Sequence, residues 1–215
     1  MNRRHALQQL GALALFAGSA GKVLAQSGSG PAYQVLEPSV PTATKGKIEV
    51  IEFFHYGCPH CHDFDPLLGQ WIKRLPADVS FVRVPAIWGN PQLQALARLY
   101  YTFEVTGQVD TLHELVFGAV QNDREPLNTE DGVRAWVGKR GIDTAKFMEA
   151  YKSFGVESLV KRADQIARAY KVQGVPTMAV DGRFITSASL TGSHEGTLKQ
   201  VDALLTRVRS EARKS

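Results

Sequence analysis

The feature that most constrains this 215-residue chain is a pair of cysteines at the junction of an apolar run and a helical pattern. The run Ile48–Phe54 is β-branched and aromatic on both faces, which is typical of a central buried strand. From Pro59 the apolar residues recur at helical spacing, and proline suits the first position of a helix. Cys58 and Cys61 are the only cysteines in the sequence, so we expect a dithiol at a helix N-terminus.

The position of this pair favours redox chemistry over structural cross-linking. A disulfide across so short a loop gains little stability from loop closure. Residues three apart on a helix share a face, so the two sulfurs can bond to each other. Free N–H groups and the positive helix end favour the thiolate of Cys58, whereas Cys61 lies one turn inside and packs against the core. Cys58 is therefore the predicted nucleophile, and Cys61 the thiol that resolves the mixed disulfide.

The two residues between the cysteines tune the redox potential of the pair. Pro59 removes one amide donor, and His60 can carry charge near neutral pH and donate toward the Cys58 thiolate. A stabilised thiolate stabilises the reduced dithiol, which makes the disulfide a stronger oxidant. The sequence thus predicts a thiol oxidase and not a reductase.

A zinc site is the alternative use of these residues. His55, His60 and His62 flank the cysteines and look like a cluster of soft ligands. A structural zinc needs four converging ligands, and all candidates here lie in one short stretch with no second Cys/His pair. We therefore expect no metal and no cofactor. His55 and His62 have a plain alternative role as polar residues at a strand end and on a helix surface.

Glu52 lies inside the apolar run, six residues before Cys58. A buried carboxylate is costly unless it is paired or neutral. Glu52 either moves protons during dithiol exchange or points to the sheet edge and pairs with Lys47, and the residues alone leave both open.

Val175 and Pro176 stand just before a second strand pattern. A cis bond here would present the Val175 backbone beside the disulfide, where an extended substrate could pair with it. An ordinary trans proline that begins a strand is the alternative.

Residues 1–25 have the pattern of a cleaved signal peptide. Arg3 and Arg4 form a basic start, an apolar run too short to span a bilayer comfortably follows, and small residues precede a cleavage point after Ala25. An N-terminal membrane anchor is the alternative. We expect export to the periplasm by the general secretory or the twin-arginine route, where a disulfide can persist. Cleavage leaves 22 Lys and Arg against 21 Asp and Glu, without a basic stripe, so we expect no nucleic-acid binding.

The remaining patterns predict an α/β protein with a helical insertion. An edge strand or arm is expected at 33–42, strands at 79–84, 177–180 and 183–185, and a final amphipathic helix. The segment from 91 to 170 shows only helical patterns, with Leu115 on a buried face, a break at Gly155 and caps at Thr129 and Asp143. We expect one α/β catalytic domain from 26–88 and 171–215, and an inserted helical domain at 89–170.

Taken together, these residues resemble the DsbA family of periplasmic thiol oxidases. The resemblance covers essentially the whole mature chain. It is carried by Glu52-Phe53-Phe54, Cys58-Pro59-His60-Cys61, Phe64, Gly174-Val175-Pro176-Thr177 and the stretch from Tyr33 through Leu36-Glu37 to Pro41.

The resemblance implies a thioredoxin-like domain with an inserted all-helical domain. It further implies a disulfide donor to newly exported proteins that is reoxidised by a quinone-linked membrane partner of the DsbB type. A cis Val175–Pro176 bond, an acid role for Glu52 and a hydrophobic groove near Cys58 also follow from the resemblance.

Other functions remain as alternatives at the level of sequence. A disulfide isomerase or reductase could use the same fold, although those usually need a dimer or a different redox potential. No dimerisation domain is visible, so we expect a monomer. A non-redox exported chaperone or a metal-binding module is the remaining alternative.

Overall fold

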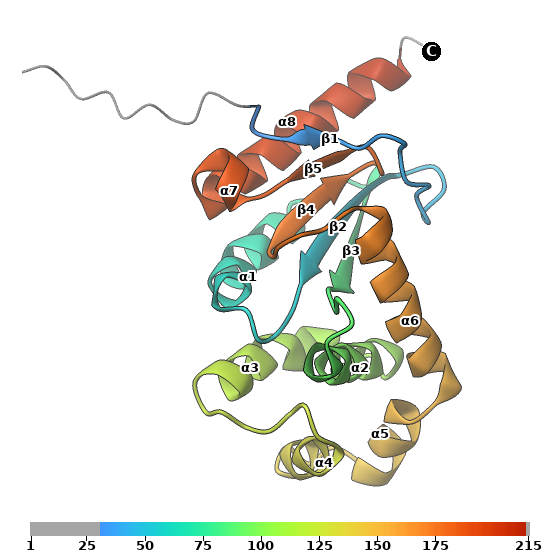
Figure 1. Cartoon of the computed structure of the whole chain (residues 1–215), viewed down its shortest axis with the longest axis vertical. Helices are drawn as coiled ribbons and strands as arrows, with labels where there is room; N and C mark the ends of the chain where they lie inside the picture. Colours follow the sequence, from blue (N-terminus) through green and yellow to red (C-terminus); the bar gives the residue numbers. More distant parts are fainter. Residues whose placement is uncertain (1–30, 214–215) are drawn as a thin grey trace, which may run out of the picture.

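The computed structural model of the chain describes residues 31–213 (Figure 1). The predicted signal peptide, residues 1–25, lies outside the described residues. Within 31–213, no helix is both long and apolar enough to cross a membrane.

The described strands form one mixed sheet in the order β1-β5-β4-β2-β3. The strands are β1 (Gln34–Val35), β2 (Ile48–Phe54), β3 (Val79–Pro85), β4 (Thr177–Val180) and β5 (Phe184–Thr186). Only the β2–β3 pair is parallel. The predicted central place of β2 is confirmed, because it pairs on both edges and is buried apart from its first residue.

Two strand predictions need correction or refinement. The strand predicted at 79–84 is one residue longer in the structure, because Pro85 belongs to β3 in register with Phe54. β3 is an edge strand, where a missing N–H costs no ladder bond. The predicted segment at 33–42 is an arm with only two strand residues, and the Leu36 and Val40 amides continue it by donating to Arg183 and Gly182.

Asp181 and Gly182 form the predicted hairpin turn between β4 and β5. Both residues have positive φ, 55° and 64°, as a two-residue turn matched to the strand twist requires. Glycine is also needed at 182 for space, since a Cβ there would lie 1.9 Å from the Val40 carbonyl oxygen. The turn therefore anchors the N-terminal arm.

Helices cover both faces of the sheet (Figure 1). On one face, α1 (Pro59–Ile72) and α8 (His194–Ala212) pack Phe64, Leu68 and Val201 against the sheet. On the other face, α6 (Phe154–Ala169) packs against the side of β2 that carries Ile51 and Phe53. The alternation of β2 therefore places Glu52 on the same face as α1.

All helices between β3 and β4 come from one continuous segment, as predicted. They are α2 (Pro91–Val105), α3 (Val109–Gln121), α4 (Glu130–Gly138), α5 (Thr144–Tyr151) and α6. Thr129 and Asp143 cap α4 and α5 as expected. One hydrophobic cluster runs from β2 into these helices, and the division into domains at 89 and 170 stays a prediction.

Three details of the helices differ from the sequence predictions. Leu115 lies on the solvent side of α3, 49% exposed, because Leu112 and Val116 already fill the buried face. Gly155 does not break a helix but lies in the first turn of α6, which Ser153 caps. The short helix α7 (Ala188–Thr191) was not predicted, since four residues are too few to show a helical period.

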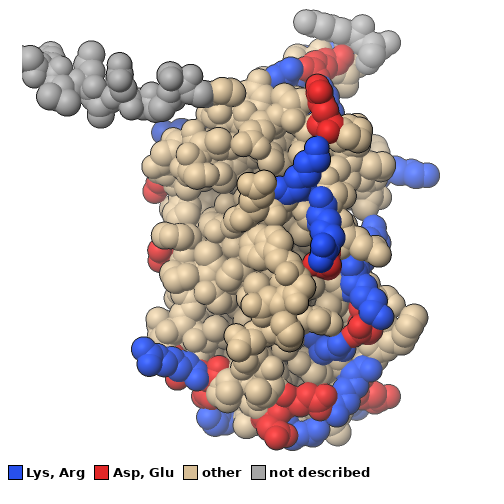
Figure 2. Space-filling view, viewed as in Figure 1, with Lys and Arg blue, Asp and Glu red and all other residues tan. Residues whose placement is uncertain are grey.

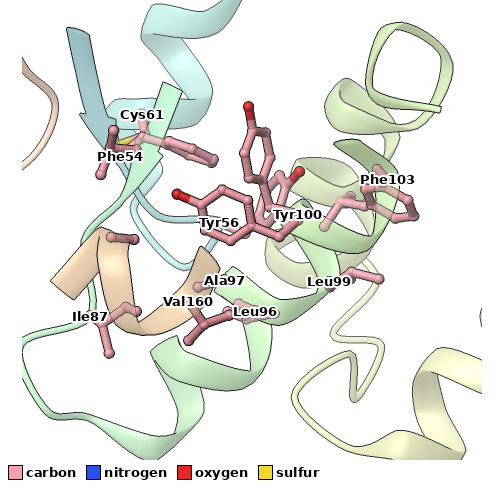
Figure 3. Close-up of a cluster of buried hydrophobic side chains, with 14 of the residues drawn as sticks. Phe54, Tyr56, Cys61, Ile87, Leu96, Ala97, Leu99, Tyr100, Phe103 and Val160 are labelled. Atoms are coloured by element: carbon pink, nitrogen blue, oxygen red, sulfur yellow. The ribbon is translucent and has the colours of Figure 1, made fainter. Parts of the chain in front are cut away.

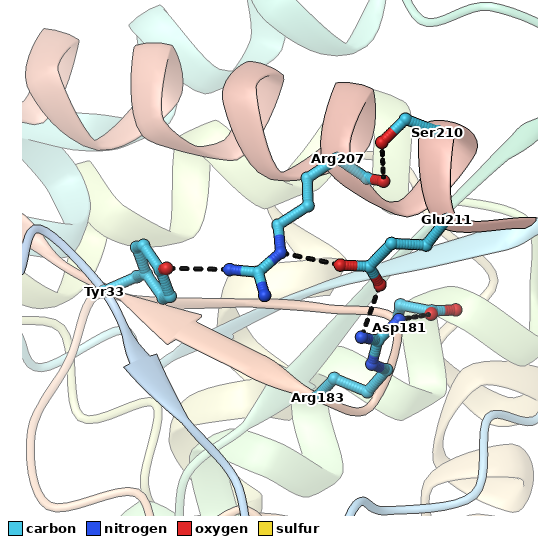
Figure 4. A network of polar contacts seen from close by, with 6 residues as sticks. All are labelled: Tyr33, Asp181, Arg183, Arg207, Ser210 and Glu211. Carbon is cyan, nitrogen blue, oxygen red and sulfur yellow. Dashed lines mark hydrogen bonds and ion pairs between the residues drawn. The ribbon is translucent and has the colours of Figure 1, made fainter. Parts of the chain in front are cut away.

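A polar network fastens the arm and the hairpin to α8 (Figure 4). Arg207 donates to the Tyr33 hydroxyl and to Glu211, and Glu211 also accepts from Arg183, which lies 3.6 Å from Asp181. These groups are partly exposed, and such ion pairs each contribute no more than about 1 kcal/mol. The network orients these segments more than it stabilises the fold.

Candidate active site

The two cysteines lie at the start of α1, in different environments. Cys58 is the N-cap residue in an extended conformation, and Pro59 opens the helix. Cys58 is 8% exposed, whereas Cys61 is fully buried. Both sulfurs are thiols in this structure. One helical turn thus separates a sulfur at the surface from one in the core.

The surroundings of Cys58 favour its thiolate. The Cys61 thiol hydrogen bonds to the Cys58 sulfur, and the backbone amides of Cys61 and His60 also donate to it. Together with the charge on His60, these donors outweigh the effect of burial and lower the pKa of Cys58 to about 6. The predicted placement of Cys58 at a set of free helix-end donors is therefore realised.

The surroundings of Cys61 favour its protonated thiol instead. Burial, the hydrogen bond to Cys58 and the negative charge of Glu52 all raise its pKa far above that of a free thiol. A buried sulfur without cationic partners keeps its proton until a neighbouring group removes it. The pair can therefore present one anionic and one protonated sulfur at neutral pH.

The loop before β4 closes over Cys58. The Val175–Pro176 bond is cis, and the Cys58 thiol donates to the Val175 carbonyl oxygen at 3.4 Å. Chain segments more than a hundred residues apart thus meet at the reactive sulfur.

A groove of about 1020 Å³ runs along this loop and reaches the exposed His60. Its walls are mixed: Val175, Pro176 and Leu190 are apolar, whereas His194 and Glu195 at the start of α8 are polar or charged. The groove is large enough for an extended segment of chain, and its lining is less uniformly hydrophobic than the family resemblance implies.

Glu52 lies beneath the cysteines and is 1% exposed. Its carboxylate accepts from Arg83 Nε at 3.0 Å, across the β2–β3 pair. The alternative in which Glu52 points to the sheet edge and pairs with Lys47 is wrong, because β2 is central and its α1 face is covered. Burial raises the pKa of Glu52 to about 7, although the Arg83 charge opposes the shift.

Two charged residues complete this cluster. Arg83 also donates to Asp65 of α1 at 3.0 Å, so one cation serves two carboxylates. Burial acts to raise the pKa of Asp65, but contacts with His113 and Arg83 lower it below its ordinary value. The surroundings thus favour the ionised form of Asp65 beside Arg83, whereas burial favours the protonated form of Glu52.

Helix α3 supplies contacts that the sequence prediction missed. Gln121 donates through its amide to the carbonyl oxygens of Tyr56 and Cys58, both at 2.9 Å. Phe117 stacks flat on His62 with ring centroids 5.4 Å apart, and His113 hydrogen bonds to the Tyr56 hydroxyl. These residues recur every four positions of α3, a spacing that marks one helix face.

An aromatic group surrounds the β2–α1 turn. Figure 3 shows Phe54, Tyr56 and Tyr100 gathered next to Cys61. Phe54 packs edge-on against both tyrosine rings, with centroid distances of 5.3 Å. The packing keeps solvent away from Cys61 and from the acid cluster.

The candidate zinc ligands do not form a chelating group. His62 stacks on Phe117, and His55 lies edge-on to Trp88. Within 31–213, no three His, Cys, Asp or Glu side chains are arranged to hold a metal ion.

Figure 2 shows positive and negative side chains interspersed at the margins of one face, with few charges at its centre.

Comparison with known proteins gives a consistent result. A family model described as a DSBA-like thioredoxin domain matches residues 77–195. The thiol:disulfide interchange protein DsbA of Pseudomonas aeruginosa is 38% identical over 186 residues, covering 86% of this chain and 88% of the relative. The protein of the same name from Bordetella pertussis is 39% identical over 201 residues, covering 93% of each chain.

Solved structures agree with these sequence matches. The crystal structure of Pseudomonas aeruginosa DsbA superposes with a TM-score of 0.82 at 37% identity, covering 85% of this chain and 95% of that chain. The oxidoreductase NmDsbA1 of Neisseria meningitidis gives a TM-score of 0.77 at 26% identity, with 86% and 95% coverage.

Proposed function

The chain belongs to the DsbA family of thioredoxin-like thiol:disulfide oxidoreductases, and from this premise we propose that it donates its Cys58–Cys61 disulfide to newly exported proteins. Family membership confirms the predicted fold class, an α/β thioredoxin-like fold with a helical insertion, and the predicted enzyme class. The direction of electron flow, the substrates, the partner and the compartment belong to the proposal.

One observation carries the proposed direction: the two sulfurs have opposite acidities. A depressed pKa at Cys58 and an elevated one at Cys61 stabilise the reduced form as a thiolate beside a thiol. An enzyme whose reduced form is stabilised holds its disulfide weakly and transfers it readily.

The proposed reaction has two exchange steps. A substrate thiolate attacks Cys58 Sγ of the enzyme disulfide, the Cys58–Cys61 bond breaks, and Cys61 leaves with the electron pair and takes up a proton. A second substrate thiolate then attacks the substrate sulfur of the mixed disulfide, and Cys58 leaves as a stable thiolate. The substrate gains a disulfide and loses two protons, of which Cys61 keeps one and solvent receives the other.

Glu52 is the proposed proton donor to Cys61. It is a buried acid with a pKa of about 7, and its charge acts on the Cys61 thiol. An acid with a pKa near the working pH exchanges protons efficiently in both directions. His60 and Pro59 act at Cys58: the His60 charge stabilises its thiolate, and Pro59 removes one amide donor at the helix start.

The proposed substrate site is the groove along Val175 and Pro176. The Val175 backbone lies at hydrogen-bonding distance from Cys58, so an extended substrate that pairs with this backbone would bring its own cysteine to the reactive sulfur. Unfolded exported chains fit this requirement because their backbone is free to pair.

The remaining parts of the proposal concern the compartment, the oligomeric state and the redox partner. We expect a periplasmic monomer released by cleavage of residues 1–25 and reoxidised by a quinone-linked membrane oxidase of the DsbB type. The basis is the signal-peptide pattern, and a disulfide-donating enzyme needs an electron acceptor to act more than once.

Oxidation of a reduced, unfolded protein substrate by the purified oxidised enzyme tests the proposed direction. We expect stoichiometric transfer of one disulfide per enzyme and no transfer in Cys58→Ser or Cys61→Ser, because neither variant can form the enzyme disulfide. When Cys61→Ser is instead mixed with a disulfide-bonded substrate, the Cys58 thiolate should attack that bond and the mixed disulfide should accumulate, because the resolving thiol is absent. Net reduction of an oxidised substrate by the reduced enzyme at equal concentrations would instead identify a reductase.

A further inference from the structure

A chain of buried polar groups connects helix α3 to the charges beneath Cys61. The Tyr56 hydroxyl lies 2.8 Å from His113 Nδ1, and His113 Nε2 lies 3.3 Å from Asp65 Oδ1. The same Asp65 oxygen accepts from Arg83, whose other nitrogen reaches Glu52. Tyr56 and His113 are 1% and 6% exposed, so this end of the connection is shielded from solvent.

The chemistry of the partners fixes the protonation of His113. The Asp65 carboxylate can only accept, so the imidazole nitrogen that faces it, Nε2, carries the proton. Nδ1 is then free to accept from the Tyr56 hydroxyl, while the Nε2–H dipole lies beside the Asp65 carboxylate. Burial, the largest influence, lowers the pKa of His113 and agrees with a neutral ring at pH 7.

Several other groups face this connection from the elements packed around it. Tyr100 of α2 packs its ring edge-on against His113, and the Glu52 charge acts to raise the pKa of Tyr100. Glu114 of α3 acts to raise the pKa of His113. Neither of them donates a hydrogen bond to Asp65 or Glu52 among the described contacts. Arg83 is therefore the described hydrogen-bond donor to the acid pair, and His113 Nε2 contacts Asp65 Oδ1 at 3.3 Å without the alignment of a hydrogen bond.

Asp65 and Glu52 compete for one cation, and His113 reaches only Asp65. We propose that His113 is a positioning residue for dithiol exchange: it holds Asp65 ionised on Arg83 and thereby leaves Glu52 as the acid that carries the exchangeable proton beside Cys61. This inference rests on the proposed proton transfer by Glu52 in the function above. It gives the inserted helical segment, which contains α3, a part in the chemistry of the cysteines.

Loss of the His113 imidazole beside Asp65 has a defined consequence. Without it Asp65 is a weaker partner for Arg83 and takes up a proton more readily. A neutral Asp65 no longer repels the Glu52 charge, and Arg83 becomes available to Glu52 alone. Asp65 then binds a proton more readily than in the wild type and Glu52 less readily, so Glu52 carries the exchangeable proton beside Cys61 less of the time.

Carbon-13 NMR titration of the Asp and Glu side-chain carboxyls in the oxidised full chain tests the proposal. Signals of the pair are assigned with Glu52→Gln and Asp65→Asn. In His113→Phe we expect Asp65 to titrate at higher pH and Glu52 at lower pH than in the wild type. The Glu52 limb of the pH profile of substrate oxidation should move to lower pH with it.

Three further variants make the test specific. In His113→Gln an amide can lie with its N–H beside Asp65 and accept from Tyr56, so both carboxyls should titrate closer to their wild-type values. Tyr56→Phe should shift both carboxyls in the same direction as His113→Phe but less, and it decides the question if His113→Phe does not fold. His62→Phe removes a neighbouring imidazole that stacks on α3, and both titrations should stay unchanged.

Unshifted Asp65 and Glu52 titrations in His113→Phe and Tyr56→Phe would overturn the proposal, as would equal shifts in His62→Phe. The carboxyl titration does not depend on the direction of the enzyme. A wild-type protein that reduces its substrate would therefore contradict the proposed function and leave this inference to be decided by the shifts alone.

Discussion

At the scale of single residues, one turn of helix gives two identical side chains opposite properties. Cys58 receives hydrogen bonds from a thiol and two backbone amides, whereas Cys61 is enclosed by aromatic rings and lies near a carboxylate. The difference comes from position: Cys58, at the N-cap, faces the free amides of the first turn, whereas Cys61, the third residue of α1, points into the core. Asymmetry in acidity is therefore built into the spacing of the motif.

Ultraviolet thiolate absorbance of the reduced protein, followed against pH, measures this asymmetry. We expect Cys58 to titrate with a midpoint of about 6. The midpoint should rise in Cys61→Ala, which removes the strongest donor, and rise less in His60→Leu. His62→Leu serves as the control and should leave it unchanged. A wild-type midpoint near that of a free thiol, ~8.5, would rule out a stabilised thiolate.

Glu52 should make stability depend on pH in a direction unusual for a carboxylate. Burial raises its pKa from 4.5 to about 7, so the folded state holds the proton more tightly than the unfolded state. The free energy of unfolding therefore falls as the pH rises from the pKa of Glu52 in the unfolded chain, 4.5, through its pKa in the folded protein, about 7. The loss is about 3 kcal/mol at most. Denaturant unfolding of the oxidised protein should show this decline between pH 4 and 8 in the wild type but not in Glu52→Gln. Parallel curves for the two proteins would contradict it.

At the scale of elements, the β4–β5 hairpin determines where the N-terminal arm lies. The turn at Asp181 and Gly182 has positive φ at both residues, and the Gly182 carbonyl accepts from the Val40 amide. The same hairpin begins directly after Pro176. A change in this turn therefore acts on the sheet edge that borders the substrate groove.

Gly182→Ala should be more destabilising than Gly192→Ala. Both glycines have positive φ, 64° and 86°, and share the cost of placing a side chain there, roughly 1 kcal/mol. Only at 182 would the new Cβ meet backbone, at 1.9 Å from the Val40 oxygen, whereas nothing lies within 4 Å at 192. Denaturant unfolding should give at least about 2 kcal/mol for Gly182→Ala. Equal losses would show that the arm does not pack against the turn.

Local patterns predicted most elements of this fold but not the contacts between them. The apolar run of β2, the proline at the start of α1 and the Asp-Gly turn each carry their signal within a few residues. Leu115 was placed on the wrong side of α3, because apolar spacing alone does not tell which side of a helix is covered.

The same is true of the site: its local motifs were predicted, but its contacts between distant segments were not. Cys58, His60 and Pro176 were identified from short motifs, and the structure brings them together. The partner of Glu52 was not identified, because pairing with Arg83 depends on the register of two strands 31 residues apart. The spacing of His113, Phe117 and Gln121 is a visible helical signal, but nothing in the sequence tells that this face of α3 meets the cysteines.

At the scale of the whole molecule, redox state and folding stability are coupled. Whatever stabilises the Cys58 thiolate in the folded protein stabilises the reduced fold, and no such gain exists once Cys58 is in a disulfide. The very short disulfide loop adds little stability to the oxidised form. The folded state therefore favours the dithiol and makes the disulfide easy to give away.

The reduced protein should accordingly be more stable than the oxidised one. The pKa of Cys58 is lowered, so its contribution is lost as pH falls through about 6 and grows as pH rises above that value. Allowing for solvent screening at the helix end, the difference should be about 1 kcal/mol at pH 7. Paired denaturant unfolding curves at pH 5 and pH 7 measure it. An oxidised form that is the more stable at pH 7 would contradict the coupling.

Equilibration of the purified protein with defined ratios of reduced and oxidised glutathione tests the central claim most directly. The fraction of Cys58–Cys61 dithiol at each ratio gives the reduction potential. A disulfide donor with a stabilised thiolate should remain largely reduced even in strongly oxidising mixtures, with a potential clearly above that of the glutathione couple. A protein that is already oxidised in predominantly reduced glutathione would have a reducing potential, and the proposed function would then be wrong.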